Sequence, residues 1–206
     1  RGLPAQAERF LLMQRRRETQ DAWWSCAQGE SWLANPSGAG PKPTLRCAPA
    51  ATKPKLDGKL DDPVWQAARA ATIRGADNGE KPAVLVKTAY DDEFLYIAIE
   101  CRREPNVEYG ETPGPRPRDA DLAGRDRVDI LLDLDRDFTT YYRLTVDHRG
   151  WTADECWNDR SWNPTWFVAA ATDGDTWTAE AAVPLDQLTG RYPRSGDAWA
   201  LGVQRV

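Results

Sequence analysis

The chain has 206 residues and a formal net charge of −5, from 27 basic and 32 acidic side chains. No stretch gathers Lys and Arg into a basic stripe, so a nucleic-acid-binding function is not expected. The apolar runs are far shorter than the roughly 20 residues that cross a bilayer, so no membrane span is expected. The unusual feature is the content of ten Trp, a residue that suits both protein cores and stacking against sugar rings.

The first 50 residues differ in composition from the rest of the chain. Residues 5–22 are rich in helix-forming side chains and predict a short helix. Residues 35–54 are rich in Pro, Gly, Ala and Lys, which is typical of a linker. We therefore expect a partly helical extension and linker over residues 1–50, followed by a folded domain over residues 51–206.

Within residues 51–206, apolar and polar side chains alternate with a period of two, which indicates β-strands. The predicted strands are 83–90, 94–101, 127–133, 141–147, 151–155, 177–183 and 199–206. Turn-forming residues separate them, and residues 105–124 predict a long exposed loop. The pattern predicts an all-β fold, an antiparallel β-sandwich.

The alternation also predicts which side chains face the core. Those expected inside are Val128, Ile130, Leu132, Leu144, Val146, Trp177, Ala179, Leu201 and Val203. The opposite phase carries Asp129, Arg143, Glu180 and Gln204, which converge on one sheet face if their strands are neighbours. Carboxylate, guanidinium and amide groups form the paired hydrogen bonds that sugar hydroxyls require. The alternative is a solvated face crossed by ion pairs.

Residues 157–166 hold three Trp separated by turn-forming and hydrogen-bonding side chains, which predicts a loop. Aromatic side chains on such a loop suit sugar stacking, and we assign that role to Trp157 and Trp162. The alternative is that one or more of these Trp belong to the core, above all Trp166.

Three alternate carboxylates, Asp133, Asp135 and Asp137, follow the predicted strand 127–133. Carboxylates spaced in this way can converge on a hard cation such as Ca²⁺. A solvated acidic turn is the alternative.

Four cysteines without any CxxC spacing exclude zinc-ribbon and thioredoxin-like sites. Their even number predicts two disulfides, Cys26–Cys47 and Cys101–Cys156, as in exported proteins. The alternative is four thiols in a cytosolic domain. The sequence contains no signal peptide, so a secreted, periplasmic or cell-surface location is an inference.

Catalytic signals are weak in this sequence. Acidic pairs lie in turns or on a charged strand face, without the apolar setting that raises a carboxyl pKa. The only histidine, His148, lies in a turn with no nucleophile motif nearby, and we interpret it as a surface residue. We do not expect an enzyme.

Four segments in order resemble the family 9 carbohydrate-binding modules, which are DOMON-like sandwiches: residues 56–65 (LDGKLDDPVW), 89–96 (AYDDEFLY), 125–133 and 176–184. The closing strand 199–206 also fits, so the resemblance covers residues 54–206. It implies a jelly-roll-like sandwich with immunoglobulin-like layers, structural calcium, and non-catalytic binding of glycan ends or short sugars. It also places Asp129 and Gln204 at sugar-contacting positions.

The chain departs from that family in two places. Ala123-Gly124-Arg125 stands where the family has one of two sugar-enclosing Trp, and the family's last strand would follow Val206. We therefore expect the sandwich to lack that strand.

Related sandwiches bind haem through Met and His or Lys ligands. Met13 lies outside the sandwich and His148 lies in a turn, so haem is not expected. The competing hypothesis is a structural or interaction module with no sugar ligand, and either kind of module would have other domains of the same polypeptide as partners.

Overall fold

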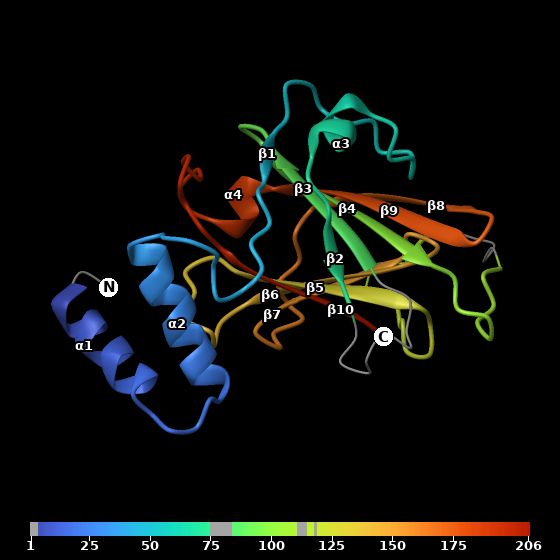
Figure 1. Ribbon diagram of the computed structural model, residues 1–206. Coiled ribbons are helices and arrows are strands. Elements are labelled where there is room, and N and C mark those ends of the chain that lie inside the picture. Colours follow the sequence, from blue (N-terminus) through green and yellow to red (C-terminus); the bar gives the residue numbers. More distant parts are fainter. Residues whose placement is uncertain (1–3, 75–83, 111–114, 118) are drawn as a thin grey trace. The chain divides into compact units, whose positions relative to one another are not determined.

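The computed structural model describes residues 4–74, 84–110, 115–117 and 119–206, in two compact units of residues 1–44 and 45–206. The first unit is a pair of contacting helices, α1 (Pro4–Arg15) and α2 (Ala22–Ala34) (Figure 1). The expected short helix is present as α1, although it ends at Arg15 rather than near residue 22, and α2 was not predicted. Asp21 is the N-cap residue of α2, because its side chain accepts a hydrogen bond from the Trp24 backbone N–H at 2.8 Å.

The second unit contains two β-sheets. The strands of the six-stranded sheet are β1 (Ala48–Pro49), β2 (Ala71–Ile73), β3 (Val84–Tyr90), β4 (Phe94–Arg102), β9 (Thr176–Pro184) and β8 (Phe167–Asp173), and those of the four-stranded sheet are β10 (Ala200–Arg205), β5 (Arg127–Asp133), β6 (Tyr142–Asp147) and β7 (Thr152–Cys156). The first sheet has the order β1-β3-β4-β9-β8, with β2 also paired to β3, and the second the order β10-β5-β6-β7. Every pairing is antiparallel except that of β1 with β3. The predicted all-β sandwich is confirmed, although the predicted strand start at Ala83 lies outside the described residues.

The main core lies between the two sheets. All nine side chains predicted to face inward belong to this core or pack against it. Ile130 and Trp177, from opposite sheets, are both completely buried, as period-two alternation requires when one face of each sheet is covered. The inward assignments are confirmed.

A second, smaller core covers the outer face of the six-stranded sheet. Residues 54–68, which we call the strap, include the short helix α3 (Pro63–Ala67) and cross that face (Figure 1). Trp65 is completely buried against Tyr96 and Ala182 among others. This explains why β4 and β9 are apolar on both faces.

Several parts of the second unit differ from the expectation, among them the short strands β1 and β2, which were not predicted. Strand β8 was not predicted, because its Ala-rich sequence (FVAAATD) has low β-propensity. The predicted exposed loop over 105–124 is partly wrong, because Ala120 and Leu122 are buried. The Ala120 N–H donates to the carbonyl oxygen of Thr152 at 3.0 Å, so this part of the loop pairs with the sheet edge.

All four cysteines lie among the described residues and are free thiols, so the predicted disulfides are not formed in this structure. Cys101 is completely buried on β4, opposite Trp177 of β9, where it serves as an apolar core residue. Cys156 ends β7 in the other sheet. Burial raises the Cys101 pKa to about 12, which keeps this group a thiol.

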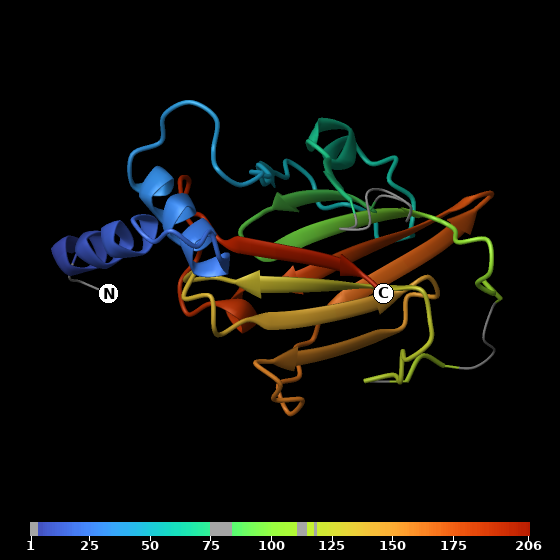
Figure 2. The same cartoon turned by 60° about the horizontal axis from the view of Figure 1, so that its bottom comes forward.

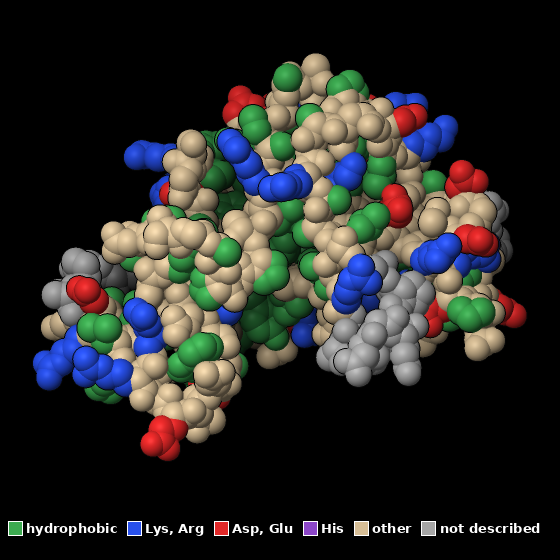
Figure 3. Space-filling view, in the orientation of Figure 1, with side chains coloured by type: hydrophobic (Ala, Val, Ile, Leu, Met, Phe, Trp, Pro, Cys, Tyr) green, Lys and Arg blue, Asp and Glu red, His purple; other side chains and the backbone are tan. Residues whose placement is uncertain are grey.

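Acidic and basic side chains are interspersed over the face drawn in Figure 3. Among the described residues, no helix has the length and apolar character needed to cross a bilayer.

Candidate functional site

The outer face of the four-stranded sheet brings three of the predicted polar residues together. The strand register places Gln204 opposite Asp129, Asp129 opposite Thr145, and Thr145 opposite Ala153. This polar row crosses β10, β5, β6 and β7 in turn, and Figure 2 shows these strands side by side. With neighbouring strands about 4.8 Å apart, the row spans about 14 Å.

A second row lies two residues further along the strands. It places Gly202 opposite Leu131, Leu131 opposite Arg143, and Arg143 opposite Glu155. An Arg143 guanidinium nitrogen lies 2.9 Å from a Glu155 carboxylate oxygen, which fixes both groups. Leu131 is half-buried and gives the face an apolar centre.

Side-chain contacts also hold the polar groups of this face in position. The Asp129 carboxylate accepts a hydrogen bond from the Thr145 hydroxyl at 2.9 Å, and its Oδ1 lies 3.8 Å from Arg127 Nε. The Arg143 guanidinium lies 5.8 Å from the centre of the Tyr141 ring. A fixed carboxylate, a guanidinium and the exposed Gln204 amide supply the donors and acceptors that vicinal hydroxyls need.

An exposed Trp lies where the edge strand β7 ends. Cys156 and Asp159 exchange two backbone hydrogen bonds, of 3.0 and 2.8 Å, across a two-residue turn. Trp157 and Asn158 at its centre have φ values of +49° and +66°. Asn tolerates this left-handed conformation, but a bulky side chain such as Trp is strained by it. Trp157 is nevertheless 60% exposed, so the turn presents an indole to solvent.

This turn lies beside the second row. Glu155 is two residues before Trp157, and its carboxylate is 3.8 Å from Arg160 Nε on the far side of the turn. The Trp157 N–H donates to the Tyr141 carbonyl oxygen at 2.9 Å. The polar face thus has an aromatic edge that includes Tyr141, which the sequence analysis did not single out.

The other two Trp of residues 157–166 have different environments. The Trp162 ring lies 4.6 Å from that of Tyr142 and packs against the main core, on the inner side of the sheet. Trp166 is 7% exposed, and its indole N–H donates to Asp154 at 3.0 Å. The alternative of a core role for Trp166 is confirmed, and Trp162 is separated from the polar row.

Glu180 does not belong to this face. It lies on β9 of the six-stranded sheet, under the strap, and is completely buried. Its carboxylate accepts hydrogen bonds from the Trp65 indole at 2.6 Å, the Gly58 N–H at 2.8 Å and the Asp57 N–H at 3.1 Å. Burial raises the Glu180 pKa, and these donors oppose the rise. The expected convergence of Glu180 with Asp129 is wrong, because their strands belong to different sheets.

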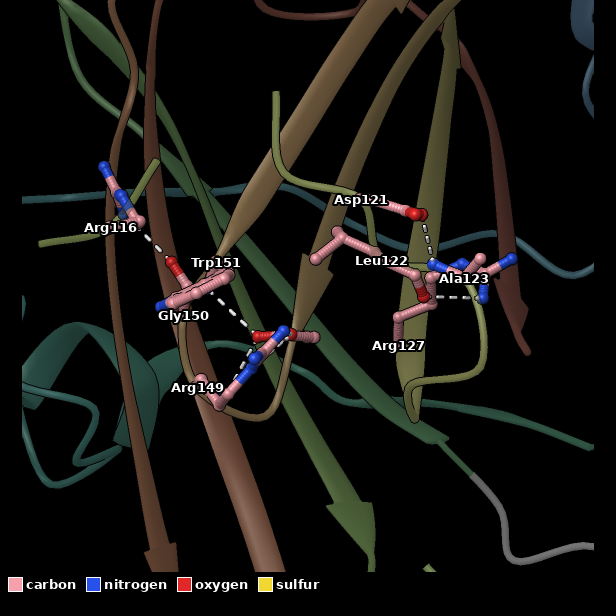
Figure 4. Close-up of polar contacts among 9 residues, drawn as sticks. Arg116, Asp121, Leu122, Ala123, Arg127, Arg149, Gly150 and Trp151 are labelled. Atoms are coloured by element: carbon pink, nitrogen blue, oxygen red, sulfur yellow. Dashed lines mark hydrogen bonds and ion pairs between the residues drawn. The ribbon is translucent and has the colours of Figure 1, made fainter. Parts of the chain in front are cut away.

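Residues 119–125 close one end of the polar face (Figure 4). Arg127 on β5 donates to the Leu122 carbonyl oxygen at 3.1 Å, and Leu122 is 5% exposed. Ala123 and Gly124 lie in this segment and contribute no aromatic ring. The sugar-enclosing Trp of the resembling family therefore has no counterpart here.

Trp151 and Arg149 form a second fixed group at this end of the sheet, also shown in Figure 4. The Arg149 guanidinium lies 3.9 Å from the Trp151 ring centre and forms an ion pair with the buried Asp147. The Arg149 guanidinium therefore covers a face of the Trp151 ring.

The predicted cation ligands do converge. Asp133, Asp135 and Asp137 each bring a carboxylate oxygen within 4.8 Å of the others. Both Asp133 oxygens accept backbone hydrogen bonds, from residues 136 and 138 at 2.6 and 2.8 Å. Backbone and hydroxyl hydrogen bonds from Thr140 hold the Asp137 pKa well below its usual range, so this group is ionised. Three carboxylates at such spacing fit a hard cation that takes oxygen ligands.

His148 is not the surface residue that its turn predicts. It is 4% exposed, and its ring lies 4.9 Å from that of Tyr109. Burial lowers its pKa and favours the neutral ring.

The neighbouring Asp126 is the centre of a buried polar network. It accepts hydrogen bonds from Arg205 at 2.6 and 2.7 Å, from the Tyr109 hydroxyl at 2.5 Å and from the Trp177 indole at 2.8 Å. The network fastens β10 to the other sheet. These groups therefore have a structural role at the end of the core.

Comparison with known proteins agrees with this architecture. Two structures of a family 9 carbohydrate-binding module from Caldicellulosiruptor kristjanssonii are similar to this chain. The complex with cellotriose has a TM-score of 0.55 at 18% identity, covering 78% of this chain and 76% of that one. The complex with glucose has a TM-score of 0.57 at 17% identity, covering 77% and 75%. A putative carbohydrate-binding protein from Bacteroides uniformis has a TM-score of 0.51 at 12% identity, covering 72% and 75%.

No curated protein matches the chain. The sequence profile described as carbohydrate family 9 binding domain-like matches residues 56–206, which include most of the strap and every strand from β2 to β10. The chain therefore belongs to the family 9 carbohydrate-binding domain-like family.

Proposed function

We propose that the sandwich binds carbohydrate without catalysis, on the outer face of its four-stranded sheet. The observation that carries the proposal is the exposed Trp157, held in a strained turn beside the fixed Arg143–Glu155 pair. Strained backbone persists where surrounding structure imposes it, and it concentrates at binding sites. The similar modules whose structures contain cellotriose and glucose support the same ligand class.

The two kinds of side chain contribute differently to binding. Stacking removes apolar area of both the indole and the sugar from water, which is favourable. Hydrogen bonds from Asp129, Arg143 and Gln204 mostly replace bonds to water and therefore set specificity. For a shallow, exposed site we expect dissociation constants from about micromolar to millimolar, or about −8 to −4 kcal/mol.

A glycan array followed by calorimetric titration tests the proposal. Trp157→Ala should strongly weaken oligosaccharide binding, and Asp129→Ala should weaken it less. Phe167→Ala is the matched control, because Phe167 is 49% exposed but lies on β8 of the other sheet. If the wild-type protein binds no glycan on the array, the sandwich is better interpreted as a structural or interaction module without a sugar ligand.

The same proposal includes export and a place among other domains of one polypeptide. Both rest on the family, because the free thiols remove the support that disulfides would have given. It also includes a structural Ca²⁺ bound by Asp133, Asp135 and Asp137. The ion would neutralise three converging carboxylates at the end of β5, next to the polar face.

A further inference from the structure

We infer that the polar face contains two separate sugar subsites and so takes an oligosaccharide rather than a single ring. The inference rests on the proposed function. One subsite is formed by Asp129 and Gln204, on the adjacent strands β5 and β10. The other is formed by Trp157 and Tyr141, beyond the end of β7 and before the start of β6.

Distance separates the two subsites. Gln204 and Glu155 lie on opposite edge strands of the sheet, three strand spacings or about 14 Å apart. Their rows are also two residues apart along the strands, which adds an offset of about 7 Å. Trp157 lies two residues beyond Glu155, so no single sugar ring reaches from Gln204 to its indole.

The floor between the subsites is suited to a further ring. Leu131 lies there, half-buried, with Arg143 on one side and Gly202 on the other. A Cβ atom at Gly202 would approach Leu131 Cδ1 to 3.3 Å, so the glycine leaves the leucine uncovered. Gly202 is not among the residues of positive φ, so the backbone does not require glycine at this position. Space above Leu131 is what the glycine provides.

The edges of the sheet leave room for a chain near Gln204 and Trp157. Among the described residues, no strand pairs with the outer edge of β10, and Ala120 pairs with β7 only at Thr152, the end of that strand away from Trp157. Residues 119–125 close the face at one end of the strands, and the acidic turn after β5 lies at the other. A glycan chain therefore fits obliquely across the strands, from Gln204 toward Trp157.

Calorimetric titration with glucose, cellobiose, cellotriose and cellotetraose tests this inference. We expect cellotriose to bind at least about tenfold more tightly than glucose, since it alone of these two can occupy both subsites. Trp157→Ala should bring cellotriose to within about threefold of glucose. Trp157→Tyr should keep most of the length dependence, and Asp129→Asn should weaken glucose and cellotriose alike. Phe167→Ala should change neither.

Equal affinity for glucose and cellotriose would overturn the inference while leaving the proposed function intact. So would a Trp157→Ala variant that weakens both sugars by the same factor, because that result means one shared site. If no member of the series binds, the inference fails. A blank glycan array would then overturn the proposed function as well. Circular dichroism of each variant shows whether the fold is kept.

Discussion

Replacing Gly58 with alanine tests how the strap is held on the six-stranded sheet. Gly58 has φ of +80°, and its backbone N–H donates to the buried Glu180 carboxylate. A Cβ atom placed there would lie 2.6 Å from the backbone of Ala170 and Ala171. That distance is shorter than any real Cβ contact, and strand backbone cannot move aside as a flexible side chain can.

The expected loss of stability has two parts. A left-handed conformation costs a non-glycine residue about 1–2 kcal/mol. Overpacking against fixed neighbours costs about 1–3 kcal/mol more. The free energy of unfolding should therefore fall by about 2–5 kcal/mol. Displacing the strap would also lengthen the hydrogen bonds that Glu180 accepts, which favours the upper end of this range.

Denaturant unfolding, followed by Trp fluorescence, measures the change. Gly124→Ala is the matched control, because Gly124 has φ of +71° but no atom within 4 Å of the added Cβ. It should lose only the conformational part, about 1–2 kcal/mol. Gly150→Ala should fall between the two, since its Cβ would lie 3.3 Å from that of Ala170. The reasoning is refuted if Gly58→Ala and Gly124→Ala destabilise the protein equally.

Three further predictions concern the buried network, the acidic cluster and the thiols. Burial opposes ionisation of Asp126, but hydrogen bonds from Arg205 and other donors outweigh burial and lower the Asp126 pKa. The carboxylate therefore contributes to the free energy of unfolding above about pH 4, and this contribution is lost as the pH falls through the lowered pKa. Asp126→Asn should cost about 3–5 kcal/mol at pH 7 and much less near pH 3, and an unchanged pH profile would contradict this. Calcium at 1,000 times its dissociation constant should stabilise the fold by about 4 kcal/mol and raise the melting temperature. Asp133→Asn should weaken that effect. A melting temperature that neither calcium nor a chelator changes would exclude the calcium site. Thiol titration of the unreduced, denatured protein should find four free cysteines, and two or none would show disulfides after all.

The strands of the sandwich were predictable because their apolar residues alternate. Strand 127–133, for example, buries Val128, Ile130 and Leu132 and carries the polar Asp129 between the first two of them. The order of the strands was not predictable, because alternation shows which face a residue occupies but not which sheet its strand joins. That is why Glu180 and Asp129 share an outward phase yet lie on opposite outer faces of the sandwich.

The candidate site was predictable only in part, for a related reason. Composition indicated a Trp-rich loop, but Trp157, Trp162 and Trp166 differ in environment because the chain turns sharply at Trp157. Asn158 was the available signal for a left-handed turn, since Asn is common in two-residue hairpins. Leu131 was visible as an apolar residue in outward phase, but alternation alone does not show whether such a residue is covered by another segment or left half-exposed, as it is here.

The first and last of the four sequence motifs that resemble the family maintain the fold rather than the binding face. Asp57-Gly58 and Trp65 from the first motif donate three hydrogen bonds to Glu180 from the last one, so residues more than 110 positions apart form one buried contact. That contact lies on the six-stranded sheet, and the polar row lies on the four-stranded sheet. Substitutions on the polar face therefore leave the hydrogen bonds between the strap and Glu180 unchanged. A relative can keep these hydrogen bonds and differ on its polar face, as this chain does in having no Trp at residues 123–125 while presenting Trp157 at the opposite edge of the sheet from Gln204.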